Sequence, residues 1–136
     1  MPDLSSLQLI YRPDLDLLAA RWLTDSTPLN IQAEYEALLV AGQTHATGRW
    51  LLDLRRRSIP AAEVAQWVTY DWLPRAAAAM APIRLRLAYF ISPGRRDALR
   101  TDASFYASAQ EALAPERPYD LQLFSDEGEA VSWLLA

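Results

Sequence analysis

The chain contains no cysteine and no lysine, and its only histidine is His45. Without cysteine, disulfides, thiolate catalysis, iron–sulfur clusters and the usual structural zinc sites are excluded. Without lysine, Schiff-base chemistry and a lysine-dependent phosphate loop are excluded as well. A single histidine rules out a histidine-rich metal site and leaves only that residue for a serine–histidine–acid triad. The sequence therefore predicts no metal site, no cofactor and no catalytic residues.

Long hydrophobic runs are also missing. No apolar stretch approaches the roughly 20 residues that a membrane-spanning helix needs. The N-terminal residues Met-Pro-Asp-Leu-Ser-Ser lack the basic and then apolar pattern of a signal peptide, so a cytoplasmic location is expected. The net charge of -4 argues against a nucleic-acid partner, which usually requires a basic surplus. A length of 136 residues fits one domain, 1–136, that can bury a core of its own.

Hydrophobic patterning indicates strands that alternate with helices. Residues 7–12 alternate with the two-residue period of a half-exposed strand, and Pro13-Asp14 turns the chain into a second strand that pairs with the first as a hairpin. The nearly unbroken apolar run after Arg49 is typical of a central buried strand. We expect strands at 7–12, 15–23, 49–55, 84–91 and 119–124, and helices at 28–46, from 60 to 80 with a kink at Pro74, from 97 to Pro115, and from Asp126 onward.

This order predicts an α/β fold with a mixed, mainly parallel five-stranded sheet and an N-terminal antiparallel hairpin. The later strands alternate apolar and polar residues, so the helices should lie mostly on one face. The other face would then be a large, semi-apolar surface, of the kind that marks an interface. Its expected residues are Ile10, Leu18, Trp22, Leu51, Phe90 and Phe124, and of these Leu18, Trp22, Phe90 and Phe124 are the candidate contacts of a partner or of a homodimer.

Arginines follow two of the predicted strands. Arg55, Arg56 and Arg57 end the third strand, and Arg95 and Arg96 follow the fourth. Because the carboxyl ends of parallel strands share one edge, where open sheets bind ligands, these guanidinium groups could form an anion-binding site. The alternative is a solvated rim that pairs with nearby acids such as Asp97 and Glu63.

Asp53 lies within the apolar central strand. It could be a carboxylate with a raised pKa that serves as an acid or base, or it could pair with an arginine of a neighbouring strand, for which Arg84 and Arg86 are the candidates. His45 falls in the last turn of its helix, where a cation is stabilised by the helix macrodipole, and a structural role is favoured.

The order of elements, the strand Trp50-Leu51-Leu52-Asp53-Leu54 and the C-terminal run from Phe124 to Leu134 together resemble the STAS-like, or SpoIIAA-like, family of small bacterial domains. That resemblance implies a mostly non-enzymatic role, as in anti-sigma-factor antagonists, transporter appendages or small-ligand sensors. The antagonists carry a phosphorylated serine in an Asp-Ser pair at the start of the helix after the central strand. This chain has Ser58-Ile59-Pro60 there, which makes Ser58 a possible phospho-acceptor in an altered context.

Three functions follow as hypotheses. The first is a non-catalytic regulatory or binding domain that recognises a protein partner or a small anionic or lipidic ligand. The second is a homo-oligomeric assembly module that uses the face without helices. The third is a small enzyme that uses Asp53 with nearby arginines.

Overall fold

The computed structural model describes residues 6–57, 62–95, 97 and 117–136. Its centre is a five-stranded sheet whose strands follow one another in chain order, β1-β2-β3-β4-β5. β1 and β2 form an antiparallel hairpin, and β2 to β5 pair in parallel. The predicted α/β class with a mainly parallel sheet is therefore confirmed. The strands are β1 (Leu7–Arg12), β2 (Leu17–Trp22), β3 (Arg49–Asp53), β4 (Leu85–Phe90) and β5 (Tyr119–Phe124).

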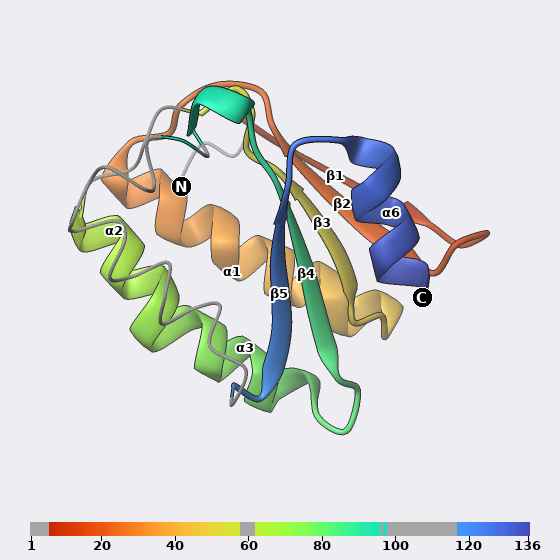
Figure 1. Ribbon diagram of the computed structural model, residues 1–136. Helices are drawn as coiled ribbons and strands as arrows, with labels where there is room; N and C mark the ends of the chain where they lie inside the picture. The colour runs from red at the N-terminus through yellow and green to blue at the C-terminus, as the bar shows by residue number, and fades with distance from the viewer. Residues whose placement is uncertain (1–5, 58–61, 96, 98–116) are drawn as a thin grey trace.

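Three helical segments and a π-helical turn cover one face of the sheet (Figure 1). α1 (Pro28–His45) is capped at its N-terminus by Thr27, whose side chain accepts a hydrogen bond from the Asn30 backbone N–H at 3.2 Å. α2 (Ala62–Trp67), η1 (Val68–Trp72) and α3 (Leu73–Met80) then form one continuous helical run. The widened turn η1 lies where the kink at Pro74 was expected, because proline has no N–H to continue an α-helical ladder.

The main core lies between these helices and the sheet. Three tryptophans, Trp22, Trp50 and Trp72, are almost fully buried in it. Their indole N–H groups are satisfied by the Glu34 carboxylate, the Thr47 carbonyl and the Tyr35 carbonyl, so the rings bury a large apolar area without leaving a donor unpaired.

α6 (Glu127–Leu135) crosses to the opposite face and packs on β3, β4 and β5 (Figure 1). The helix begins where it was predicted and is capped there, since the Asp126 carboxylate accepts a hydrogen bond from the Glu129 backbone N–H at 2.9 Å. Ala130 and Leu134 on α6 are buried against a second, smaller core that includes Leu51 and Phe90. The second face is thus partly covered within the chain itself, which weakens its case as an open assembly surface.

Leu18 and Trp22 lie on the face opposite to the one predicted. Both are about 1% exposed in the main core under α1, so they cannot contact a partner. In β2 the residues Leu17, Ala19 and Arg21 face α6 instead. The error has a physical cause, because β2 is apolar on both sides and its sequence has no alternation that would identify a face.

Several predictions fall outside the described residues, namely Ser58, Arg96 and almost all of the helical stretch expected between 97 and 115. Within the described part of the chain, no helix is both long enough and apolar enough to cross a membrane.

Candidate functional site at the carboxyl edge of the sheet

The two arginine segments meet at one edge of the sheet, as their positions predicted. β3 and β4 run in parallel, and beyond their last paired residues the Leu54 N–H donates to the Phe90 carbonyl at 2.8 Å. Arg95 reaches back across this edge, and its Nη1 atom donates to the Leu54 carbonyl at 3.4 Å. The segments that follow β3 and β4 are therefore in direct contact, at the edge where open parallel sheets bind ligands.

Arg55 is already engaged by the protein. Its Nε and Nη2 atoms donate to the two oxygens of Asp53 at 3.0 and 2.9 Å, and its guanidinium group lies 4.2 Å from the centre of the Phe90 ring. An arginine held on both sides in this way has little left to offer a ligand. Arg55 thus belongs to the rim that pairs with its own acids.

Asp53 pairs with Arg21 and Arg55 rather than with Arg84 or Arg86. Arg21 donates from Nη1 at 2.8 Å and bonds Glu127 of α6 through its other terminal nitrogen. Burial raises the pKa of the Asp53 carboxyl, but the hydrogen bonds from Arg55 and Arg21 outweigh burial and hold that pKa below its usual range. Asp53 is therefore a structural anion.

The two arginines proposed as its partners have other contacts. Arg84 forms an exposed ion pair with Asp120 at 2.9 Å. Arg86 lies 4.4 Å from the centre of the Trp133 ring and donates to the Ala136 carbonyl at 2.9 Å. Both extend from the start of β4 rather than from the edge that carries Asp53.

Arg57 and Arg95 form the part of the rim that faces the main core. The guanidinium carbon of Arg57 lies 5.2 Å from the centre of the Trp22 ring, at the end of β2. Burial lowers the pKa of Arg95, and the nearby positive charge of Arg57 lowers it further. The carboxylate of Asp25 acts on Arg95 in the opposite direction. Two guanidinium groups from neighbouring strand ends are thus held within electrostatic reach of each other.

Tyr89, near the end of β4, is the residue that sequence reasoning missed. Its hydroxyl oxygen is buried and has no hydrogen-bond partner among the residues that the structure describes. Burial raises its pKa well above the ordinary value, and the charges of Arg57 and Arg95 act on it in the opposite direction. A tyrosine just before the end of a strand that leads to arginines was the available signal, but an unpartnered hydroxyl cannot be seen without coordinates.

The other described residues that the sequence singled out do not contribute to this site. Arg56 is exposed. His45 stacks on Tyr11 with ring centres 4.1 Å apart, in keeping with a structural role at the end of α1. Phe90 and Phe124 do lie on the second face, where they pack with α6 residues rather than with a partner. Among the described residues, no group of three or more histidine, aspartate or glutamate side chains lies together as a metal site would require.

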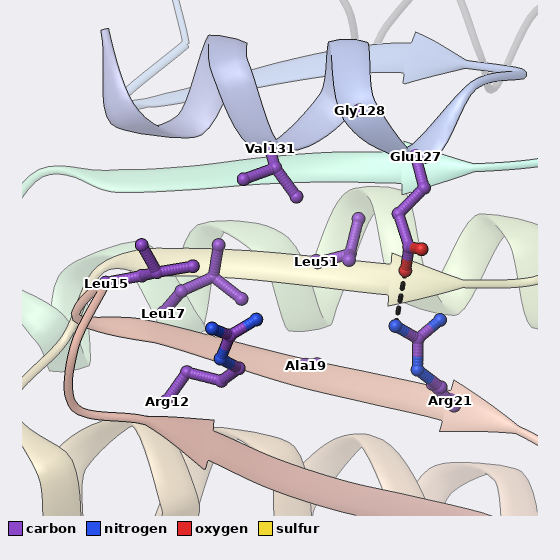
Figure 2. Close-up of a pocket in the computed structure, with 9 residues that line it drawn as sticks. All are labelled: Arg12, Leu15, Leu17, Ala19, Arg21, Leu51, Glu127, Gly128 and Val131. Atoms are coloured by element: carbon purple, nitrogen blue, oxygen red, sulfur yellow. Dashed lines mark hydrogen bonds and ion pairs between the residues drawn. The ribbon is translucent and has the colours of Figure 1, made fainter.

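A groove also runs along the second face, between α6 and the β1–β2 hairpin (Figure 2). Its volume is about 350 Å³, at the lower end of the range of roughly 300–1,000 Å³ that is typical of ligand pockets. The ion pair of Arg21 and Glu127 closes one end, and Arg12 extends over the floor while paired with Asp14 at 2.7 Å. The lining residues are Arg12, Leu15, Leu17, Ala19, Arg21, Leu51, Glu127, Gly128 and Val131.

The floor of this groove offers little surface to a ligand. Leu17 and Ala19 are 2% and 5% exposed because neighbouring side chains already cover them. Both arginines along it are neutralised by carboxylates. The carboxyl edge, where the charges of Arg57 and Arg95 act on the buried Tyr89 hydroxyl, is the better candidate for binding.

Comparison with known proteins adds no further assignment, because no family model, no curated protein and no solved structure matches this chain. The resemblance to STAS-like domains remains a prediction from the sequence.

Proposed function

We propose that this chain is a non-catalytic binding domain that holds a small anionic ligand at the carboxyl edge of its sheet, between Arg57 and Arg95. The observation that carries the proposal is that two guanidinium groups, of which that of Arg95 is half-buried, lie within electrostatic reach of each other at the edge where parallel sheets bind ligands. Like charges repel when brought together, and an anion between them converts that repulsion into two charge-assisted hydrogen-bonding partners.

The state of Asp53 supports binding rather than catalysis. A general acid or base works best when its pKa lies near the operating pH. The pKa of the Asp53 carboxyl has instead been driven further from neutrality by two arginines, and the residue is buried. It is therefore a weak base and holds no proton to donate at neutral pH, which disfavours the enzyme hypothesis built on it.

The test is a thermal-shift and calorimetric screen of the whole chain with sodium phosphate, sodium sulfate, sodium acetate and nucleotides. A ligand at ten times its dissociation constant stabilises the folded state by about 1.4 kcal/mol. In a domain of this size that corresponds to a rise in Tm of roughly 4–7 °C. We expect such a rise for at least one anion, and we expect Arg57→Gln and Arg95→Gln to remove most of it.

Two matched variants separate a specific site from general positive charge. Arg84→Gln removes a guanidinium group at the opposite end of β4, and Arg56→Gln removes an exposed one from the same arginine run. Both should keep the ligand-induced rise in Tm. If all four variants lost the ligand-induced rise in Tm to the same extent, the rim would attract anions only through net charge. If no anion raised the Tm of the unmutated chain, the proposal would be refuted.

Three predictions from the sequence stay predictions, namely a cytoplasmic location, membership of the STAS-like family and a possible homodimer. A protein partner that presents an anionic group could use the same two arginines, but the partial burial of Arg95 favours a small ligand that can reach below the rim.

A further inference from the structure

The Tyr89 hydroxyl lies where the proposed ligand would reach the main core. In the register of the sheet Tyr89 pairs with Leu52, two residues before the Leu54 carbonyl that Arg95 contacts. Its ring packs against the main core, on the same face as the Trp22 ring beneath Arg57. The hydroxyl thus belongs to the same corner of the sheet as the two guanidinium groups.

A buried hydroxyl without a partner is a rare and unfavourable feature. It loses its hydrogen bonds to water and regains none from the protein, and native structures contain only a few such groups. Phenylalanine would fill the same space without that loss. The presence of tyrosine at position 89 is therefore explained if the hydroxyl gains a partner that the described residues do not supply.

The chemistry of the three groups defines that partner. Arginine offers only N–H donors, and a phenol that stays protonated acts as an O–H donor. The ligand atom between them must then be an acceptor, and two flanking positive charges favour an anionic one. An oxyanion such as a phosphate or carboxylate group meets both conditions, whereas an ammonium group or an amide N–H does not.

We propose that the Tyr89 hydroxyl is a specificity-determining donor that binds the oxyanion of the ligand together with Arg57 and Arg95, so that the site takes a phosphate or carboxylate group inserted below the rim. This inference rests on the proposed function and adds the residue that selects the bound group. It also assigns a role to a hydroxyl that makes no hydrogen bond within the described part of the chain.

The experiment compares the unmutated chain with Tyr89→Phe by isothermal titration calorimetry at matched ionic strength. Sodium phosphate, sodium sulfate and sodium acetate are the probes, so that tetrahedral and planar oxyanions are distinguished. A hydrogen bond to a charged group corresponds to a loss of about 10- to 100-fold in affinity when its donor is removed. We expect that loss for the probe that binds best.

The stability of the free protein provides the second readout. Because the hydroxyl is unpartnered, Tyr89→Phe should leave the Tm of the ligand-free chain unchanged or raise it. Tyr70→Phe removes a hydroxyl from an exposed tyrosine and is the matched control, with no change expected in affinity. A Tyr89→Phe variant that binds weakly but melts lower would show that the hydroxyl has a structural role, and this would overturn the inference.

The two proposals fail in different ways. If an anion binds through Arg57 and Arg95 while Tyr89→Phe binds it as tightly as the unmutated chain, the role of Tyr89 is refuted and the proposed function stands. If no anion binds the unmutated chain, both are refuted.

Discussion

At the scale of single residues, Asp53 shows how burial and pairing act on one carboxylate in opposite directions. Its side chain is 8% exposed, a position that alone would favour the neutral acid. Two arginines donate to it, one from β2 and one two residues further along the chain. The charged form is favoured as a result, and the pKa falls below its usual value.

Replacing this carboxylate should therefore destabilise the fold in a pH-dependent way. Asp53→Asn keeps the size of the side chain but removes the charge, and we expect a loss of about 1–3 kcal/mol at pH 7, below the 3–5 typical of fully buried pairs because both arginines are partly exposed. Because the folded pKa is lowered, this stabilisation is complete above the unfolded pKa of about 3.9 and is lost as pH falls through the folded value. Urea unfolding at pH 7 and pH 3 measures both effects.

The difference in the free energy of unfolding between Asp53→Asn and the unmutated chain should be smaller at pH 3 than at pH 7. Asp14→Asn is the control. The ion pair of Asp14 with Arg12 is exposed, so its loss should change the free energy of unfolding little at either pH. A difference that stayed constant with pH would contradict the assignment of charge to Asp53.

An arginine partner for Asp53 was predictable, but its identity was not. The sequence shows that a carboxylate in an apolar strand needs a cation. Which cation it meets depends on the register between strands, and in the folded sheet Asp53 lies directly opposite Arg21 on β2 and opposite Phe90 on β4. Register is decided by the lengths and packing of the crossovers, which a single sequence does not reveal.

At the scale of elements, α1 packs against the central strand through a residue that has no side chain. A Cβ atom built on Gly42 would lie 2.2 Å from Cζ2 of the Trp50 ring. That ring is fully buried, and its N–H donates to the Thr47 carbonyl at 2.7 Å, so it cannot easily move away. The glycine thus permits the close approach of helix and strand.

Gly42→Ala should consequently destabilise the protein, although alanine is the better helix former. The gain in helix propensity is about 1 kcal/mol, and overpacking against a rigid ring costs about 1–3 kcal/mol or more, so a net loss of roughly 1–2 kcal/mol is expected in urea unfolding. Gly94→Ala is the matched control, because no atom of the described residues, its chain neighbours aside, lies within 4 Å of its added Cβ. A Gly42→Ala variant as stable as Gly94→Ala would falsify this account of the contact.

The elements themselves were largely predictable, while the faces they present were not. Alternation along β1, β4 and β5 helped to place most boundaries within one or two residues, and the predicted starts of α1 and α6 coincide with caps at Thr27 and Asp126. β2 carried no such alternation, so Leu18 and Trp22 were assigned to the wrong face. Nor does a capped amphipathic sequence show which side of a sheet its helix will cover, and for α6 that side decided how much of the second face stays open.

At the scale of the whole molecule, the sheet separates two cores of unequal size. The larger lies under α1, α2 and α3, and the smaller lies under α6, the one helix of the described residues that packs there. Leu134 is fully buried in the smaller core, whereas its neighbour Leu135 is 38% exposed. α6 is therefore held by few apolar side chains together with the ion pair from Arg21 to Glu127.

These two neighbours provide a test of how much α6 contributes. Leu134→Ala should lower the free energy of unfolding by about 2–4 kcal/mol through lost burial and a cavity. Leu135→Ala should lower it by much less, because the residue already contacts solvent. Urea unfolding with fluorescence detection measures both. Similar small losses in the two variants would indicate that the second core adds little stability, and the second face would return as a candidate interface.

The chain order of the strands bears on how the protein is made. Each of β2 to β5 pairs with the strand synthesised just before it, so a nascent chain can extend its sheet one strand at a time as it leaves the ribosome. Among the described helices only α6 covers Leu51, Ala88 and Phe90, so these side chains lack that cover until α6 emerges. A chain whose synthesis ends before residue 127 would thus expose apolar side chains on the second face of its sheet, and such a surface is bound by chaperones.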